Sequence, residues 1–234
     1  MSHLISIIIP TYDRFDLLLK SINSVKNQTY KDVEIIVVND CSTDKRYYNH
    51  DWNGINVIHK DKSSKEEFGF SCVGNVRNIG VKQSSGDYIA FLDDDDEWLP
   101  NKLETQLSKM LEKNFKFSCT EAYINSTKTK QLSQHFFNEI RNHHKSKGSN
   151  MLDNGYPEVF TKELINIHNS CITSSVLLCK SFFKSVGYFK HVPMGTHMPE
   201  DYDYWLRLLE VTDCLFLSEP MLKYNTSSHK KYQF

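Results

Sequence analysis

Strand-like and helix-like segments alternate along the first half of this 234-residue chain, and this alternation restricts the fold more than any other feature. Runs of apolar, often β-branched residues at 5–9, 33–38, 55–58 and 88–92 predict buried strands. Residues 15–25 carry apolar side chains at helical spacing, residues 74–83 predict a second helix, and Pro100 predicts the start of a third. Such alternation predicts an α/β fold with a mostly parallel central sheet flanked by helices.

The second half of the chain is less regular. Residues 172–179 predict a strand, and a helix is predicted to run from 200 to about 210, after Pro199. Residues 125–150 are rich in Lys, Asn, Ser and His and predict a polar surface segment. The length predicts a single domain over 1–234, or one domain with a small annex.

Composition and charge exclude several classes of function. The chain has 28 Lys and Arg against 29 Asp and Glu, a net charge of −1, whereas nucleic-acid-binding domains are usually basic. No apolar run approaches the roughly 18 residues of a membrane span, and the N-terminus lacks the pattern of a signal peptide. We therefore expect a cytoplasmic protein with no membrane span and no nucleic-acid partner.

The cysteines predict free thiols. None of the six is spaced Cys-x-x-Cys, which argues against a structural zinc site. Without a secretion signal, a reducing compartment is expected. The six are Cys41, Cys72, Cys119, Cys171, Cys179 and Cys214.

Polar loops follow three of the predicted strands, directly after Ile9, Val38 and Leu92. In parallel sheets, ligands bind outside the carboxyl ends of the strands. We therefore expect the three loops to converge on one crevice.

The acidic run at 93–96 is the most informative of these loops. In an extended segment alternate side chains share a face, so Asp93 and Asp95 are predicted to point together. Neighbouring carboxylates repel unless a cation joins them, and oxygen ligands suit Mg²⁺ or Mn²⁺. An EF-hand is excluded because Trp98 stands where that loop needs glycine. A solvated acidic turn is the alternative reading.

Glycine-rich phosphate loops are missing from the sequence. Gly69 and Gly74 have P-loop spacing, but Asn75 and Val76 stand where a P-loop has Lys and Ser or Thr. No G-x-G-x-x-G occurs either. Phosphate groups would therefore have to be held by a metal ion and arginine.

Five segments, in order, resemble family 2 glycosyltransferases of the GT-A fold: residues 7–14, 34–44, 76–80, 86–96 and 200–208. The resemblance implies a Rossmann-like sheet and an inverting transfer of a sugar. The donor would be a nucleotide diphosphate sugar, with a UDP-sugar expected, and the acceptor a hydroxyl on a glycan, lipid or protein. Residues 1–110 would then bind the nucleotide sugar and residues 111–234 the acceptor, with a variable part at 120–170 that the resemblance does not cover.

The resemblance also implies roles for individual residues in binding the donor and a cation. Asp40 would accept the imide N–H of uracil, and Arg77 would reach the diphosphate or ribose. A divalent cation, Mn²⁺ or Mg²⁺, would be held by Asp95 and Asp93, with His229 in the tail as a further ligand. The residues implied to bind the donor are Pro10, Thr11, Tyr12, Arg14, Asp40, Arg77, Asp93 and Asp94.

On the acceptor side, the resemblance implies that Asp201 is the general base, with Glu200 and Trp205 facing the acceptor. Simpler readings stay open for these residues. Acidic residues favour the first turn of a helix through its dipole alone, and Trp205 could instead fill the core.

Open readings remain on the donor side too. Thr11 and Arg14 could merely start a helix, and Asp40 could form an Asx turn. Cys41 stands where the family usually has glycine, so the loop is expected to avoid a glycine-only conformation.

Two other classes of function compete with a glycosyltransferase. A nucleotidyltransferase tends to have a glycine-rich, basic loop after its first strand, and residues 10–14 are not such a loop. A non-catalytic nucleotide-sugar-binding module is disfavoured because both the acidic run and Asp201 are present.

Overall fold

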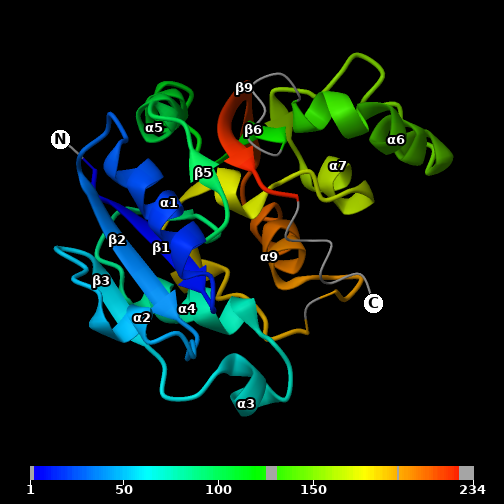
Figure 1. The fold of residues 1–234 in the computed structure, drawn as a ribbon. Helices are drawn as coiled ribbons and strands as arrows, with labels where there is room; N and C mark the ends of the chain where they lie inside the picture. Colours follow the sequence, from blue (N-terminus) through cyan, green and yellow to red (C-terminus); the bar gives the residue numbers. More distant parts are fainter. Residues whose placement is uncertain (1–2, 125–130, 194, 227–234) are drawn as a thin grey trace.

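The computed structural model describes residues 3–124, 131–193 and 195–226, and it confirms the predicted α/β fold (Figure 1). The described strands form one nine-stranded sheet in the order β3-β2-β1-β4-β8-β6-β9-β5, with β7 paired to β9. The strands are β1 (Ile5–Thr11), β2 (Val33–Asn39), β3 (Asn56–His59), β4 (Tyr88–Phe91), β5 (Glu97–Trp98), β6 (Phe117–Ile124), β7 (Val159–Phe160), β8 (Leu177–Cys179) and β9 (Cys214–Tyr224).

Helices cover both faces of this sheet. In Figure 1 the blue and cyan elements of the first half lie mainly on the left of the view, and the elements of the second half lie mainly in the centre and on the right. The helices are α1 (Phe15–Lys26), α2 (Arg46–Asn49), α3 (Ser64–Phe68), α4 (Val73–Gln83), α5 (Lys102–Glu112), α6 (Leu132–Ser146), α7 (Lys162–Ile167), α8 (Phe182–Ser185) and α9 (Glu200–Leu208), with a 3₁₀ turn η1 (Thr173–Ser175).

The first half of the sheet is parallel. β1 pairs in parallel with β2 and β4, and β2 pairs in parallel with β3, so the carboxyl ends of these strands lie at one edge. Beyond β4 the sheet is mixed: β8 is antiparallel to both β4 and β6, whereas β6 is parallel to β9. Most of the paired residues are in parallel pairs, as the sequence predicts.

Strand β1 builds a core on each face because its side chains alternate between the faces. Ile5, Ile7 and Ile9 pack with apolar residues of α1 and α5. Ile8 faces the other way and packs with residues of α4 and α9. On that face α4 lies directly on the sheet, since a Cβ on Gly80 would come within 2.5 Å of Ile8 Cγ2.

The strand predicted over 172–179 is largely a turn. Only Leu177–Cys179 forms a strand, and residues 173–175 form η1. Local side-chain bonds explain the difference, because the Ser175 hydroxyl donates to the carbonyl of Ile172 at 2.7 Å and so competes with strand pairing. The indole N–H of Trp98 also donates a hydrogen bond to the carbonyl of Ser174, at 2.7 Å, so this carbonyl is not free for strand pairing.

The polar segment predicted at 125–150 contains a helix, α6. Its Phe137 and Ile140 pack against the core, which gives an otherwise polar segment one apolar stripe. No helix within the described ranges is both long and apolar enough to cross a bilayer.

A buried lysine lies in the first turn of α5. Lys102 is fully buried; its Nζ donates to Gln106 Oε1 at 2.8 Å and lies 4.2 Å from the centroid of the Trp98 ring. Burial disfavours the charged form and lowers the pKa of Lys102 to about 7.

Lys102 should make stability rise with pH. Between pH 7 and about 10 the unfolded chain holds a proton on Lys102 that the folded chain lacks, so the free energy of unfolding increases as pH rises. Lys102→Met should reduce the increase in the free energy of unfolding between pH 7 and about 10. Denaturant titrations at several pH values measure this increase. The exposed control Lys20→Met should keep it, and equal pH dependence in both variants would contradict the assignment.

Candidate functional site

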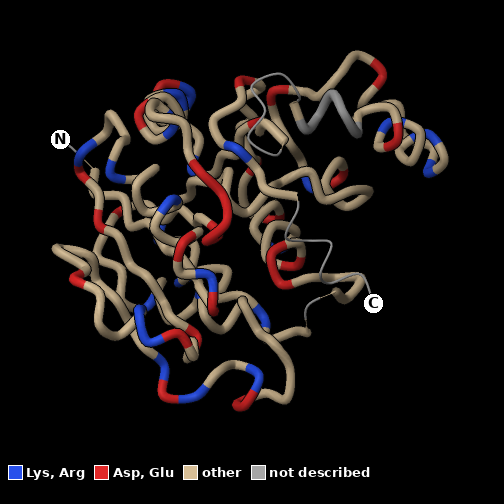
Figure 2. The backbone as a smooth tube through the Cα atoms, in the orientation of Figure 1, with Lys and Arg blue, Asp and Glu red and all other residues tan. Residues whose placement is uncertain are grey.

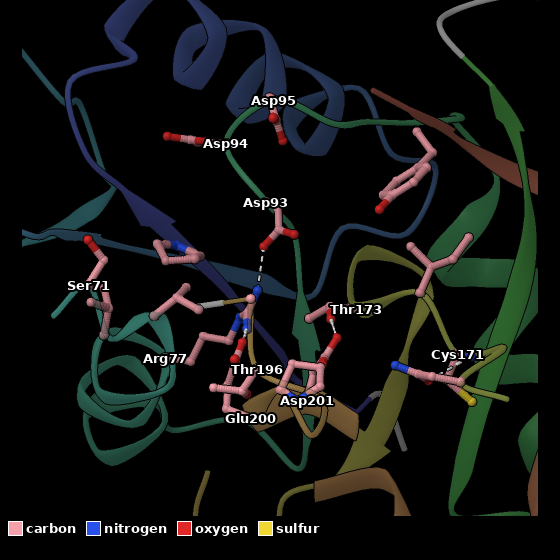
Figure 3. A pocket seen from close by; sticks show the side chains of 18 of the residues that line it. Ser71, Arg77, Asp93, Asp94, Asp95, Cys171, Thr173, Thr196, Glu200 and Asp201 are labelled. Atoms are coloured by element: carbon pink, nitrogen blue, oxygen red, sulfur yellow. Dashed lines mark hydrogen bonds and ion pairs between the residues drawn. The ribbon is translucent and has the colours of Figure 1, made fainter. Parts of the chain in front are cut away.

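The three polar loops converge on one cavity, as the parallel topology predicts. Its volume is about 1180 Å³, above the roughly 300–1,000 Å³ typical of sites for one small ligand. Every residue predicted to contact the donor lines this cavity, and so do Asp95, Glu200 and Asp201 (Figure 3). The structure therefore brings these residues together, while their individual roles stay predictions.

The acidic run forms a tight turn, not an extended segment. The backbone N–H of Asp96 donates to the carbonyl of Asp93 at 3.1 Å, which closes the turn. The expectation of an extended segment is therefore wrong, although Asp93 and Asp95 both line the cavity. Asp93 lies against Arg77, and Asp95 lies against Arg14, with nitrogen–oxygen distances of 2.8 and 3.0 Å. The run is the continuous red stretch near the middle of Figure 2.

Asp94 and Asp96 are more deeply buried than their neighbours. Asp94 accepts from the Thr11 hydroxyl at 2.8 Å and from Arg14 at 3.1 Å. Burial raises the pKa of Asp94 to about 7, although the charge of Arg14 opposes that shift. Asp96 lies behind the cavity wall, where it accepts from the backbone N–H of Asn225 at 2.8 Å, and burial raises its pKa well above the ordinary value.

Arg77 joins the acidic turn to helix α9. Its side chain extends from α4, is almost fully buried and donates to Asp93 Oδ1 at 2.8 Å and Glu200 Oε1 at 2.6 Å (Figure 3). Glu200 is 6% exposed, and burial raises its pKa despite the nearby guanidinium. Glu200 therefore holds Arg77 in place at the cavity wall.

Asp40 is bound by neighbours that the sequence analysis did not identify. Its Oδ1 accepts from Lys60 Nζ and from the backbone N–H of Ser64, both at 2.7 Å. Its Oδ2 accepts from the Ser64 hydroxyl at 2.6 Å. A lysine and a serine some 20 residues downstream give no sequence signal, because their pairing with Asp40 depends on where β3 and α3 place them.

Cys41 adopts the backbone conformation that we expected the loop to avoid. Its φ angle is 62°, in the left-handed region that favours glycine. Two hydrogen bonds hold the loop there: the Asp40 N–H donates to the carbonyl of Thr11 at 2.9 Å, and the Ser42 N–H donates to Asn39 Oδ1 at 3.0 Å. These bonds therefore hold Cys41, which has a Cβ, in a strained backbone conformation.

Asp201 lies in the first turn of α9 and faces the cavity. Its Oδ2 accepts from the Thr173 hydroxyl at 2.8 Å, and its Oδ1 accepts from the backbone N–H of Tyr202 at 2.7 Å. Asp203, two residues on, pairs instead with Lys190 and Arg207 at 2.6 and 2.8 Å. Thr173 was not predicted, since only a run of hydroxyl residues marks its segment.

One predicted site residue, Trp205, lies away from the cavity wall. Trp205 is fully buried, and its ring stacks on Phe117 at 5.5 Å between centroids, so it fills the core and has no surface for an acceptor. The helix turns Trp205 inward, beside Tyr204 and Leu208 of the same cluster. His229, the predicted further metal ligand, lies outside the described residues.

Further residues line the part of the cavity that is remote from the acidic turn. Glu139 and His143 lie four residues apart on α6 and so share one helical face. Tyr156, His168 and Asn169 complete this part of the wall. None belongs to a motif in the sequence, and only the folding of 131–169 over the sheet brings them to the cavity.

Sequence comparisons identify relatives of this chain. A family model described as "Glycosyl transferase family 2" matches residues 6–160. An uncharacterized glycosyltransferase of Rickettsia typhi is 34% identical over 229 residues, which cover 95% of this chain and 64% of that protein. A protein of Escherichia coli is 39% identical over 116 residues, which cover 49% of this chain and 44% of that protein. It is named UDP-Glc:alpha-D-GlcNAc-diphosphoundecaprenol beta-1,3-glucosyltransferase WfgD.

Structure comparisons find the same fold. S. aureus TarS, solved with UDP-GlcNAc, aligns over 95% of this chain and 58% of its own, with a TM-score of 0.68 and 19% identity. The mannosyltransferase PcManGT from Pyrobaculum calidifontis was solved with GDP-Man and Mn²⁺. It aligns over 96% of this chain and 57% of its own chain, with a TM-score of 0.64 and 12% identity. The neighbours share the GT-A fold. The chain spans less than two thirds of the length of each of these four proteins.

Replacing the strained cysteine should stabilise the protein. Cys41→Gly removes the steric penalty of the left-handed conformation but adds the larger backbone entropy of glycine to the unfolded chain, for a net gain of up to about 1 kcal/mol. Cys41→Ala keeps a Cβ and lacks the sulfur, so it is the matched control. Denaturant unfolding should rank Gly above both Ala and the parent. If the glycine variant were no more stable than the alanine variant, the backbone at position 41 would not be strained.

Proposed function

This chain belongs to glycosyl transferase family 2, and we propose that it transfers a sugar from a UDP-sugar to a hydroxyl group with inversion at the anomeric carbon. One observation carries the proposal: loops from β1, β2 and β4 and the first turn of α9 bring Asp40, the acidic turn and Asp201 to one cavity. In the proposed division, residues 1–110 hold the donor and residues 111–234 hold the acceptor.

The uridine part of the donor would bind between Tyr12 and Asp40. Tyr12 is 50% exposed at the cavity wall and offers a ring on which a base can stack. The carboxylate of Asp40 accepts three bonds within the protein, which leaves one of its roughly four lone-pair sites for a base N–H. Uracil and guanine both carry an N–H within the six-membered ring that can donate here, and adenine and cytosine have only amino N–H groups outside the ring. UDP is favoured over GDP because the E. coli relative is named for UDP-Glc and TarS was solved with UDP-GlcNAc.

A divalent cation fits the acidic turn by the chemistry of its donors. Asp93 and Asp95 offer carboxylate oxygens at the cavity wall, the ligands that Mg²⁺ and Mn²⁺ prefer. We propose that these two residues hold the ion, as PcManGT was solved with Mn²⁺. When bound, it would stabilise charge on the leaving diphosphate. Arg14 and Arg77 place fixed positive charge beside the same turn.

Asp201 would take the proton of the acceptor hydroxyl as that oxygen attacks the sugar. Thr173 and the Tyr202 N–H fix the orientation of its carboxylate toward the cavity. General-base assistance of this kind contributes typically about 10²–10⁴ in rate. The acceptor, a hydroxyl of a glycan, a lipid-linked sugar or a protein, would lie against the wall formed by Glu139, His143 and Tyr156.

Product analysis tests the class of reaction. The protein is incubated with Mn²⁺ and either a panel of nucleotide sugars or UTP with a sugar phosphate, and the released UDP or pyrophosphate is identified. Release of UDP from a UDP-sugar supports glycosyl transfer or donor hydrolysis. Release of pyrophosphate from UTP and a sugar phosphate would identify a nucleotidyltransferase instead.

Asp201→Asn should lower kcat by about 10² or more and change donor affinity by no more than a few-fold, because the lost interaction acts in the transition state. Asp203→Asn is the matched control, since Asp203 lies on the same helix turn but pairs with Lys190 and Arg207 outside the cavity. Steady-state UDP release and donor titrations measure both parameters. Near-normal kcat in Asp201→Asn, or lost donor binding, would place the base elsewhere.

Metal removal should weaken donor binding. We expect calorimetric titrations to give much weaker UDP binding in the presence of a chelator. Asp95→Asn should lose most of its activity with its fold intact, because the acidic turn then loses a negatively charged carboxylate ligand. Asp16→Asn, an exposed residue of α1, serves as the control. If binding and turnover both survive chelation, the assignment of a metal site to the acidic turn is wrong.

A further inference from the structure

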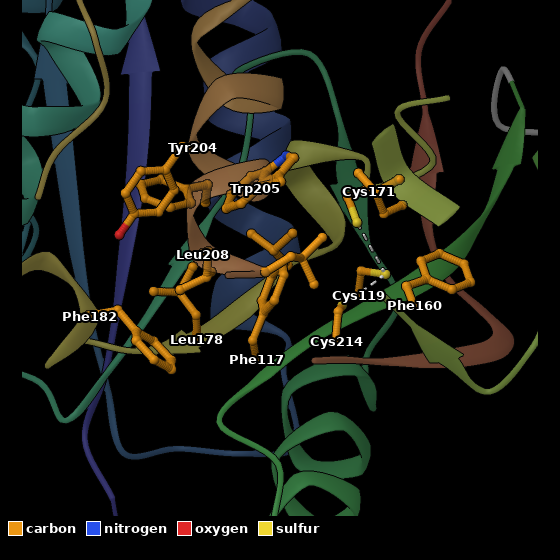
Figure 4. Packing of buried hydrophobic residues seen from close by; sticks show 14 of the residues in the cluster. Phe117, Cys119, Phe160, Cys171, Leu178, Phe182, Tyr204, Trp205, Leu208 and Cys214 are labelled. Carbon is orange, nitrogen blue, oxygen red and sulfur yellow. Dashed lines mark hydrogen bonds between the residues drawn. The ribbon is translucent and has the colours of Figure 1, made fainter. Parts of the chain in front are cut away.

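Three of the six cysteines meet in the hydrophobic core next to the cavity (Figure 4). Cys119 lies on β6, Cys214 begins β9, and Cys171 precedes η1. The Sγ of Cys119 lies 3.5 Å from that of Cys214 and 3.9 Å from that of Cys171, and all three sulfurs lie within 4.8 Å of one another. We call these three residues the thiol cluster. All three are free and at most 2% exposed.

These separations match those of sulfurs that share one metal ion. A thiolate sulfur lies about 2.3 Å from a bound ion such as zinc, so three sulfurs around one ion lie about 3.8–4 Å apart. Closing the cluster around an ion would thus need movements of a few tenths of an ångström for the two measured pairs. The three cysteines lie more than 40 residues apart in the sequence, at positions 119, 171 and 214, so a search for Cys-x-x-Cys spacing does not find the cluster.

The donor set favours a soft ion that accepts three ligands. In the part of the chain that the structure describes, no other group of three or more His, Cys, Asp or Glu side chains converges in this way, and no fourth such ligand joins the three sulfurs. Structural zinc sites are almost always four-coordinate. Thiolate ligands select soft ions, among them Cu⁺. Phe160, which lies beside the cluster in Figure 4 and stacks on Phe216, supplies no hard oxygen ligand.

The cavity gives an ion access to the cluster. Cys171 lines the cavity wall together with Thr120, Phe160 and Phe216. Cys119 lies next to Cys171, and Cys214 lies next to Cys119, so the cluster adjoins the cavity through Cys171. Cys171 is also two residues from Thr173, which donates to Asp201. An ion at the cluster would therefore tie the segment that orients Asp201 to strands β6 and β9.

We propose that Cys119, Cys171 and Cys214 form a binding site for one Cu⁺ ion. The thiol protons pass to solvent as the sulfurs coordinate, and no electron is transferred. The competing explanation is that the three thiols are small apolar side chains that fill the core. None of its ligands belongs to the acidic turn or to α9, so copper binding can be measured whether or not the proposed sugar transfer holds.

Copper retention tests the site. The reduced, metal-free protein is titrated anaerobically with Cu⁺ against a colorimetric chelator, and the copper that remains bound after desalting is counted. We expect about one equivalent per chain, a higher midpoint of thermal unfolding, and three sulfur neighbours in X-ray absorption at the copper edge. The absorption measurement uses the unaltered protein and so does not depend on any variant folding.

Single variants identify the ligands. Cys119→Ala, Cys171→Ala and Cys214→Ala should each lose the bound copper, whereas Cys72→Ala should retain it. Cys72 is the matched control because it is also buried at the cavity wall but lies outside the cluster. Copper retention by folded Cys214→Ala, copper coordinated by nitrogen or oxygen, no retained copper, or preferential retention of Zn²⁺ at the cluster would each overturn the proposal.

Discussion

A single buried guanidinium connects the three parts of the protein that form the cavity. Arg77 extends from α4, binds Asp93 of the acidic turn and binds Glu200 at the start of α9. A buried charge is tolerated only when it is paired, and removing one partner of such a pair typically costs about 3–5 kcal/mol. The requirement to keep Arg77 paired therefore fixes the distance between the turn after β4 and the first turn of α9, although more than 100 residues separate them in sequence.

The same pairing principle governs the rest of the cavity wall. Arg14 compensates Asp94 and Asp95, and Lys60 compensates Asp40, so acidic groups that would repel one another are held close together before any ligand arrives. A cation or a base that binds here joins an existing network of charges and hydrogen bonds. Such preorganisation reduces the reorganisation required when a charged ligand binds.

The parallel topology explains why much of the site was predictable from the sequence. Apolar runs identified β1, β2 and β4, and parallel pairing alone implied that the loops after Ile9, Val38 and Leu92 meet. Conformation within those loops was not predictable in the same way. The acidic run closes into a turn through a hydrogen bond between Asp96 and Asp93. Cys41 takes a left-handed conformation because hydrogen bonds from Asp40 to Thr11 and from Ser42 to Asn39 hold its loop. Trp205 shows the same limit: its spacing from Asp201 left two readings open, and packing against Phe117 decided between them.

Strand β9 has a consequence for how the chain folds. It lies between β6 and β5 and also pairs with β7, and its partner β5 precedes it by more than 110 residues. Until residues 214–224 dock, the edge of β6 has unpaired backbone groups, which are a template for pairing with another chain. Contacts between such distant segments form slowly, because the loop-closure entropy is lost before the contacts are gained. The half-formed sheet is therefore the state in which this protein is most prone to aggregate, and the docking of its last described strand ends that exposure.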